Sequence, residues 1–251
     1  MASIINLKFM LSRVIKNLFK IPIVIIRETI SITEVRHICL EQMDYDSYWN
    51  KRNVSTILPR YKIFADLINR KSKVLDIECG DGTCLWYLKA EKDIEGEGLD
   101  ISREAVTRCV KKGIRVNIAD VSSSTFKIDK KYDYIIISEV LEHIAYLEDL
   151  MRKVKGHFNK LVLVSIPNIG YYKHRIRMMF GRFPIKWAFH PAEHLRFWTV
   201  KDFIWWAKEI GFEVIDIRPY NGVPFVYKLM PNLFCHQIVF FLKNIQSEPD
   251  K

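Results

Sequence analysis

The chain has 251 residues, of which 49% are hydrophobic and 27% are charged, and its formal net charge is +10. This length and composition exclude a disordered chain and fit one folded domain with an appendage. The positive charge is concentrated in residues 1–42 and 171–200, each with six Lys or Arg residues, so we expect local basic surfaces on a nearly neutral domain.

Residues 1–43 are predicted to be a basic N-terminal extension that begins with an amphipathic helix over residues 4–20. Leu7 and Leu11 recur at helical spacing, while basic side chains fall on another face. The apolar runs are too short for a transmembrane helix and lack the pattern of a signal peptide. Two interpretations stay open: residues 1–42 contact an anionic membrane peripherally, or the helix packs on the domain or on a second subunit.

Residues 44–251 are predicted to form the domain itself. A helix is expected around residues 55–70, and from residue 73 strand-like and helical stretches alternate. The strand-like runs are residues 74–77, 96–99, 114–118, 132–137, 161–166, 212–217 and 238–242. This alternation predicts a parallel sheet with helices on both faces, although the last two strands have no clear helix between them.

A loop containing two glycines follows the first predicted strand, within residues 74–82. An apolar run carries Asp76 near its end and opens into Gly80 and Gly82 before the next helix. Glycine lets a backbone approach a ligand closely, and nucleotide cofactors bind beyond the carboxyl ends of parallel strands. The pattern therefore predicts a cofactor-binding loop.

Two further acidic residues, Asp100 and Asp120, end the next two predicted strands. A carboxylate at the first position can accept hydrogen bonds from ribose hydroxyls, and one at the second from an adenine amine. Asp76 and Asp81 would repel the pyrophosphate of a dinucleotide, whereas S-adenosylmethionine carries a sulfonium and an ammonium group and no phosphate. The charges therefore favour S-adenosylmethionine as the cofactor.

These motifs resemble those of class I S-adenosylmethionine-dependent methyltransferases. The similar segments are residues 74–82, 98–102, 119–120 and 132–138. The segments that look like the methionine biosynthesis protein W (MetW) group are residues 165–168, 175–177, 181–184 and 194–199. The resemblance covers residues 44–220 and implies an α/β fold. This fold is a Rossmann-like, seven-stranded, mostly parallel sheet with helices on both faces and an antiparallel last strand.

The residues expected to bind S-adenosylmethionine lie at strand ends or in the loops that follow them. They are Asp76, Glu78, Cys79, Gly80, Gly82, Asp100, Ile101, Ala119, Asp120, Val121, Ser138 and Glu139. One of them departs from the family pattern, which usually has glycine where this chain has Glu78. Its side chain would crowd the cofactor, or it would meet the cofactor's ammonium group favourably or its carboxylate unfavourably.

His143 follows the fourth predicted strand and is the candidate catalytic base, because histidine titrates near neutral pH. The alternative is a histidine that makes a local hydrogen bond near a helix start. Residues 171–199 are predicted to be an insertion that covers the site, with side chains suited to an anionic acceptor. Its candidate substrate-binding residues are Tyr172, Arg175, His190, His194 and Arg196. The alternative is a solvated basic helix with its aromatic side chains buried.

The sequence predicts a cytoplasmic enzyme that methylates a small or lipid-linked, anionic acceptor. No RNA-binding module is visible, which argues against a nucleic-acid partner. The five cysteines form no C-x-x-C pair and have no zinc spacing with histidine, so we expect reduced thiols and no metal. The MetW resemblance implies an alternative function, a non-catalytic partner or regulator of a homoserine acyltransferase in methionine biosynthesis. The oligomeric state stays open.

Overall fold

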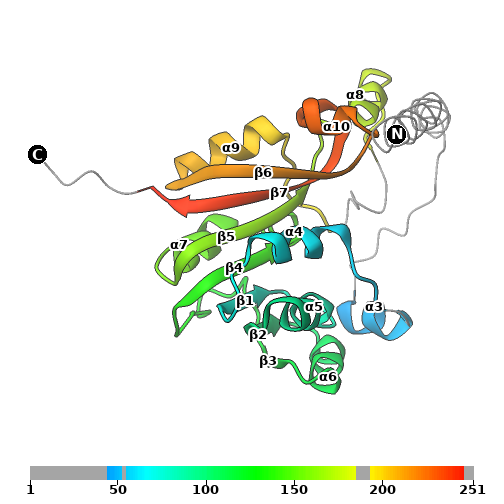
Figure 1. The fold of residues 1–251 in the computed structure, drawn as a ribbon. Helices are drawn as coiled ribbons and strands as arrows, with labels where there is room; N and C mark the ends of the chain where they lie inside the picture. The colour runs from blue at the N-terminus through cyan, green and yellow to red at the C-terminus, as the bar shows by residue number, and fades with distance from the viewer. Residues whose placement is uncertain (1–43, 53–54, 185–192, 246–251) are drawn as a thin grey trace, which may run out of the picture.

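Seven strands form one sheet in the computed structural model, which describes residues 44–52, 55–184 and 193–245 (Figure 1). In chain order the strands are β1 (Lys73–Ile77), β2 (Glu95–Asp100), β3 (Arg115–Ile118), β4 (Tyr132–Ser138), β5 (Phe158–Pro167), β6 (Phe212–Gly222) and β7 (Cys235–Asn244). Their order across the sheet is β3-β2-β1-β4-β5-β7-β6. Every strand predicted from the sequence is therefore present.

The sheet is mostly parallel. Strands β1 to β5 pair in parallel with their neighbours, whereas β7 pairs antiparallel with both β5 and β6. This confirms the predicted seven-stranded Rossmann-like sheet with an antiparallel last strand. The chain builds outward from β1 through β2 to β3 and then returns to place β4 on the other side of β1. Ligands of open α/β sheets bind at such a switch point, beyond the carboxyl ends of the strands.

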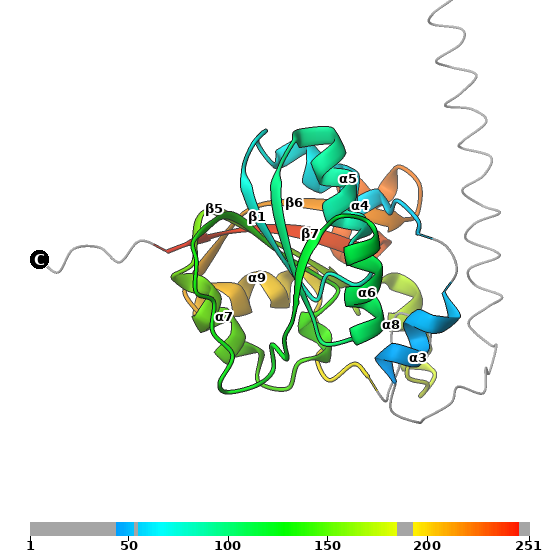
Figure 2. The same ribbon diagram turned by 90° about the horizontal axis from the view of Figure 1, so that it is seen from below.

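Helices cover both faces of this sheet (Figure 2). They are α3 (Tyr45–Lys51), α4 (Pro59–Leu67), α5 (Thr83–Lys92), α6 (Arg103–Lys111), the short 3-10 turn η1 (Leu141–His143), α7 (Leu147–Lys155), α8 (Tyr172–Met179), α9 (Val200–Glu209), α10 (Val226–Leu229) and α11 (Pro231–Phe234). One apolar core lies between the sheet and α4, α5 and α6, and the other between the sheet and α7 and α9. The central strands are buried on both sides and consist of apolar runs, as parallel strands do.

Local sequence signals explain several element boundaries. The helix expected around residues 55–70 begins at Pro59, because a proline at the first helical position has no unsatisfied N–H. Helix α9 begins after Thr199, whose side chain accepts the Asp202 N–H in a capping box. The sequence pattern missed α10 and α11 between β6 and β7, because each is only one turn long and carries no apolar period.

The predicted amphipathic helix of residues 4–20 and the proposed membrane contact of residues 1–42 lie outside the described residues. Within the residues described, no helix has both the length and the apolar character needed to cross a membrane.

Candidate functional site

The loop after β1 turns sharply at three left-handed residues. Gly80 and Gly82 have φ angles of 57° and 72°, and Glu78 has φ of 58°. Glycine adopts this conformation without strain, whereas a residue with a Cβ is destabilised by about 1 kcal/mol or more. Glu78 therefore holds a strained backbone where the related family usually has glycine.

Asp100 fixes this loop to the end of β2. Its carboxylate accepts the Gly80 N–H at 2.7 Å and the Ser102 N–H at 2.9 Å. The side chain is buried, and burial raises the pKa of Asp100 although both backbone donors oppose this shift. The next strand end lies alongside, because the Ala119 N–H donates to the Asp100 carbonyl at 3.0 Å. The structure thus brings the predicted residues of the first three strand ends together at one edge.

Asp120, just after β3, is exposed at this edge of the sheet. Its carboxylate accepts the N–H and the hydroxyl of Ser122, at 2.9 and 2.6 Å. Val121 beside it is buried in the core, whereas the Ile101 side chain is 42% exposed. Of these neighbours, Asp120 and Ile101 are the side chains that solvent or a ligand can reach.

Two predicted cofactor residues, Asp76 and Cys79, turn their side chains beneath the loop. Asp76 is buried, and burial raises its pKa to about 7, with the nearby Arg60 acting in the opposite direction. The Cys79 sulfur packs 3.8 Å from the Cys109 sulfur. Their positions support the loop from inside the core, so Cys79 can meet a ligand only through its backbone.

Glu78 lies among the other carboxylates of this edge. It accepts a backbone hydrogen bond from Ile101, and Asp100 and Asp120 are close enough to act on it. Burial is the main cause that raises the pKa of Glu78 to about 8, and the charge of Asp100 adds to it. The edge of β1 and β2 therefore gathers several carboxyl groups, which suits a ligand with a cationic or hydrogen-bond-donating group.

Helix α3 covers the glycine loop, a feature that the sequence interpretation missed. A Cβ on Gly80 would lie 2.5 Å from the Trp49 ring, so the indole lies directly over that glycine. Asp46 anchors the helix, because its carboxylate accepts the Ser102 hydroxyl at 2.5 Å and the Glu104 N–H at 3.2 Å. An acidic and aromatic run, residues 44–49, was the visible signal of this cover in the sequence.

Tyr45, on the same helix, faces the acidic edge. Burial raises the pKa of its phenol to about 12, and the charges that add to this effect come from Glu193, Glu78, Asp100 and Glu142. The side chain remains 40% exposed. A phenol in this position can donate a hydrogen bond to a ligand lying between β1 and β4.

The end of β4 places Ser138 and Glu139 at the same edge. Glu139 has a left-handed backbone with φ of 58°. Its carboxylate accepts hydrogen bonds from Ser165 Oγ (3.0 Å), Tyr220 Oη (3.2 Å) and Gln237 Nε2 (2.7 Å). The Ser138 hydroxyl lies 3.1 Å from that of Ser165. Glu139 is thus tied toward β5, β6 and β7, in a network that sequence spacing could not reveal.

His143 meets the segment that follows α8. Its Nδ1 lies 3.2 Å from the Glu193 carbonyl, and its ring packs edge-on to His194 with centroids 4.5 Å apart. The carbonyl of Glu142 accepts the N–H groups of Leu195 and Arg196 at 2.7 and 3.2 Å. Burial lowers the pKa of His143. This hydrogen bond joins His143 to a segment 50 positions away and is not a local bond, and it leaves Nε2 available to other groups.

The described candidate substrate-binding residues lie in different surroundings. His194 packs on His143, and Tyr172 packs edge-on against Tyr171. Two exposed arginines bind nearby carbonyls: Arg175 donates to Gly170 and Arg196 to Ala145, each at 2.6 Å. His190 lies outside the described residues.

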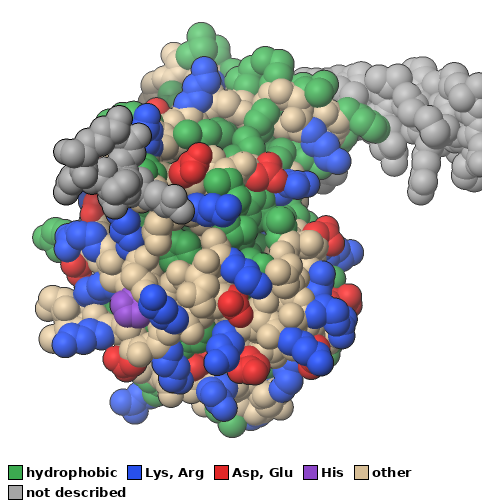
Figure 3. Space-filling view, turned by 60° about the vertical axis from the view of Figure 1, so that its left-hand side comes forward, with side chains coloured by type: hydrophobic (Ala, Val, Ile, Leu, Met, Phe, Trp, Pro, Cys, Tyr) green, Lys and Arg blue, Asp and Glu red, His purple; other side chains and the backbone are tan. Residues whose placement is uncertain are grey.

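Helix α8 differs from a solvated basic helix. Lys173, His174 and Arg177 are buried, whereas Met179 and Phe180 are 82% and 76% exposed. Figure 3 shows hydrophobic side chains gathered at the upper part of the drawn face. Below them, Lys and Arg side chains are interspersed with Asp and Glu side chains. The described part of the insertion therefore shows no single basic surface.

The chain is similar to proteins of two kinds. An uncharacterised protein of Methanocaldococcus jannaschii is 26% identical over 201 residues, which cover 79% of this chain and 78% of that protein. A ubiquinone biosynthesis O-methyltransferase of Rickettsia canadensis is 20% identical over 182 residues, 69% of this chain and 77% of that enzyme.

Solved structures share the fold. A SAM-dependent methyltransferase from Archaeoglobus fulgidus has a TM-score of 0.54 at 19% identity and covers 80% of this chain and 95% of its own. Magnesium protoporphyrin IX methyltransferase from Synechocystis, solved with bound SAH, has a TM-score of 0.53 at 14% identity and covers 86% and 93%. The fold is therefore that of class I methyltransferases. The model of the family described as methionine biosynthesis protein MetW matches residues 59–242, so the chain belongs to the MetW family.

Proposed function

We propose that this protein is an S-adenosylmethionine-dependent methyltransferase whose acceptor is a small or lipid-linked molecule with an anionic group. One observation carries the proposal: Asp100, at the end of β2, binds the glycine loop at Gly80 beside the switch point of a methyltransferase fold. Relatives and structural neighbours named as methyltransferases support it.

The residues of the acidic edge fit this cofactor. Asp100 and Asp120 add carboxylates at this edge, Glu78 with its raised pKa adds a carboxyl group that can donate or accept a hydrogen bond, and no phosphate has to be accommodated. When bound, the cofactor supplies a methyl group already activated by its sulfonium. In this proposal Asp100 accepts hydrogen bonds from ribose hydroxyls, and Asp120 accepts one from the adenine amine. Trp49 and Tyr45 on α3 would exclude water from the bound cofactor.

His143 is the candidate base for the transfer. With the cofactor bound, Nε2 of His143 would accept the proton that an acceptor oxygen or nitrogen loses on methylation. The Glu193 carbonyl holds Nδ1 and so orients the imidazole. Arg196, which is exposed and bound to the Ala145 carbonyl, would attract an anionic acceptor.

Calorimetry with S-adenosylmethionine and S-adenosylhomocysteine tests this function. Asp100→Asn should weaken the binding of both by about 10-fold or more, because a charged acceptor of two N–H groups is lost. The matched control is Asp133→Asn, since Asp133 also accepts a backbone N–H, that of Lys73, at the opposite edge of the sheet. If the folded wild-type protein binds neither ligand, the proposal is wrong.

The MetW match and the strained Glu78 favour a second candidate, a non-catalytic partner of a homoserine acyltransferase. Under this alternative, Glu78→Gly would gain S-adenosylmethionine binding that the wild-type protein lacks. The wild-type protein would also co-purify with an acyltransferase in stoichiometric amount from its own cells. Binding of the cofactor by the wild-type protein, without such a partner, would exclude it.

A further inference from the structure

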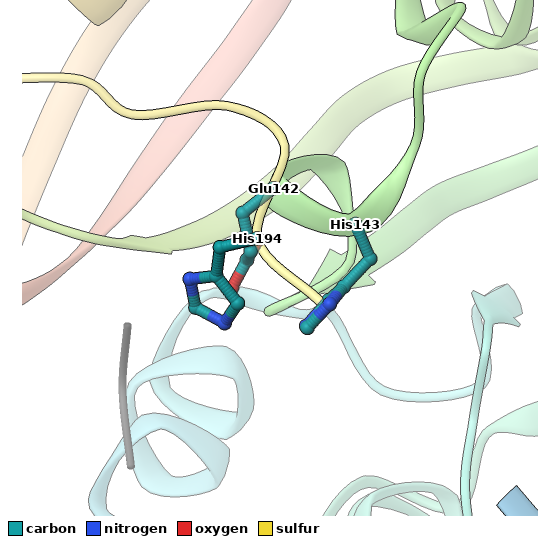
Figure 4. A group of neighbouring side chains, drawn as sticks. All are labelled: Glu142, His143 and His194. Atoms are coloured by element: carbon teal, nitrogen blue, oxygen red, sulfur yellow. The ribbon is translucent and has the colours of Figure 1, made fainter. Parts of the chain in front are cut away.

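We propose that Glu142, His143 and His194 form a binding site for a divalent metal ion, and that Zn²⁺ is the ion whose ligand preferences they fit. One donor atom from each residue lies within 4.8 Å of the others. Figure 4 shows the three side chains converging from the turn after β4 and from the loop that precedes α9. This site departs from our expectation that the chain holds no metal.

The backbone brings these distant residues together. His194 follows His143 by 51 positions, so their spacing in the sequence carries no metal signal. Two hydrogen bonds from the N–H groups of Leu195 and Arg196 to the Glu142 carbonyl hold the two segments in contact. The arrangement is therefore built by the fold before any ion binds, which lowers the cost of binding.

The Glu142 carboxyl group is the strongest sign of a missing ligand. It is 1% exposed, and its Oε2 has no hydrogen-bond partner among the residues that the structure describes. A buried polar atom without a partner destabilises a fold by about 1–3 kcal/mol. A cation bound at this oxygen would remove that penalty.

The orientation of His143 also fits a metal ligand. Its Nδ1 lies 3.2 Å from the Glu193 carbonyl, which fixes the tautomer that leaves Nε2 as an acceptor. Metal-binding histidines commonly donate their second nitrogen to a carbonyl in this way.

The donor set selects the class of ion. Two imidazoles and one carboxylate suit Zn²⁺, whereas Mg²⁺ and Ca²⁺ prefer oxygen ligands alone. Tetrahedral Zn²⁺ with bonds of about 2.0–2.1 Å places its ligand atoms roughly 3.3 Å apart, so the side chains must close by about 1.5 Å at most. Three protein ligands leave one position open.

The proposed methyl acceptor would occupy the open position, and this part of the inference rests on the proposed function. An ion there would hold the acceptor oxygen and lower its pKa, so that its proton leaves to solvent. His143 would then act as a ligand, and Nε2 would not serve as the base. Binding of the ion itself requires neither the cofactor nor the acceptor.

Metal binding to untagged, chelator-treated protein tests the site without cofactor. Co²⁺ is the spectroscopic probe and Zn²⁺ the competitor, with His143→Gln, His194→Ala and Glu142→Gln as site variants. The matched control is His157→Ala, because half-buried His157 also has Nδ1 near a carbonyl, that of Lys153, at 2.7 Å. Circular dichroism confirms that each variant is folded.

We expect one Co²⁺ per chain, displaced by Zn²⁺, with affinity lowered about 100-fold or more in the folded site variants and unchanged in the control. Absence of Co²⁺ and Zn²⁺ binding by the folded wild-type protein would overturn the site. Equal affinity in the control and in all folded site variants would also overturn it. S-adenosylhomocysteine binding, measured separately, shows whether the proposed function stands or fails independently.

Discussion

Glu78 and Glu139 occupy matching positions, each directly after one of the neighbouring strands β1 and β4, and each has φ of 58°. A left-handed backbone is uncommon for a residue with a side chain. The two carboxylates point to different surroundings: Glu78 faces Asp100, whereas Glu139 is bound by Tyr220 and Gln237. The switch point of the sheet therefore carries strain on both of its strands, as functional sites often do.

Glu78→Gln should reduce the loss of stability of the protein at alkaline pH. Burial and the charge of Asp100 raise the pKa of Glu78 to about 8, and Asp120 and Asp76 act in the same direction. The folded protein therefore keeps a proton that the unfolded chain releases near pH 4–5. This stabilising contribution is complete below the unfolded pKa and is lost as the pH rises through about 8.

Urea unfolding at about pH 6.5 and about pH 9 measures the effect: between the two conditions the free energy of unfolding of the wild-type protein should fall by about 2 kcal/mol more than that of Glu78→Gln. The control is Glu95→Gln, at the exposed start of β2, which should behave like the wild-type protein. Parallel pH curves for wild type and Glu78→Gln would show that Glu78 holds no extra proton.

Gly80→Ala should destabilise the protein through two separable effects. The new Cβ would lie 2.5 Å from the Trp49 ring, and φ is left-handed. Gly113 offers a matched control, because it is also left-handed but has nothing within 4 Å of the site of a Cβ. We expect a loss of about 1 kcal/mol for Gly113→Ala and about 2–3 kcal/mol for Gly80→Ala.

A double-mutant cycle with Trp49→Ala isolates the steric part. In that background Gly80→Ala should cost no more than Gly113→Ala, since only the backbone strain remains. Chemical denaturation of the four proteins supplies the measurement. An unchanged penalty would mean that α3 does not lie over the loop in solution.

Arg60→Gln should destabilise the protein more at alkaline than at acidic pH. Burial raises the pKa of Asp76 to about 7, and Arg60 opposes this shift. Above pH 7 Asp76 is ionised and needs the cation, whereas below it the neutral carboxyl does not. Urea unfolding should show that Arg60→Gln lowers the free energy of unfolding by about 2–3 kcal/mol near pH 8.5 and by less near pH 6.

Arg70→Gln is the control, because it removes an exposed arginine that is bound to the Glu91 carbonyl. If Arg60→Gln lowered the free energy of unfolding equally at both pH values, the pairing of Arg60 with Asp76 would be wrong.

Thr199→Ala should lower the free energy of unfolding by about 1 kcal/mol, because the Thr199 side chain caps α9. Thr107→Ala is the matched control, since its hydroxyl donates only to the exposed Arg103 carbonyl. Thermal unfolding of both variants compares them. If Thr107→Ala lowered the free energy of unfolding as much as Thr199→Ala, the capping hydrogen bond of Thr199 would have no special role.

The sequence predicted what depends on local pattern. The strand runs and the acidic strand ends were visible because buried parallel strands are apolar and their carboxyl ends meet at one edge. From that principle the sequence predicted that Gly80 and Asp100 lie close together, and the structure shows a 2.7 Å hydrogen bond from the Gly80 N–H to the Asp100 carboxylate. The one-turn helices between β6 and β7 left no periodic signal.

The parts that escaped prediction depend on contacts between distant segments. Trp49 over Gly80 requires α3 to fold back across the sheet, and the network of Glu139 draws on strands nearly 100 positions away. The approach of His194 to His143 arises from backbone pairing. Neither spacing nor composition encodes such placements, because they arise when the sheet assembles.

The two N–H groups that clasp the Glu142 carbonyl come from the main chain at residues 195 and 196. Amide groups belong to every residue except proline, so exchanges of the exposed Leu195 side chain leave the clasp intact. A proline at either position, or a residue inserted between 193 and 196, would instead displace His194. In homologous chains we therefore expect the residue type at position 195 to vary, whereas the number of residues in the loop around residues 193–196 should stay constant.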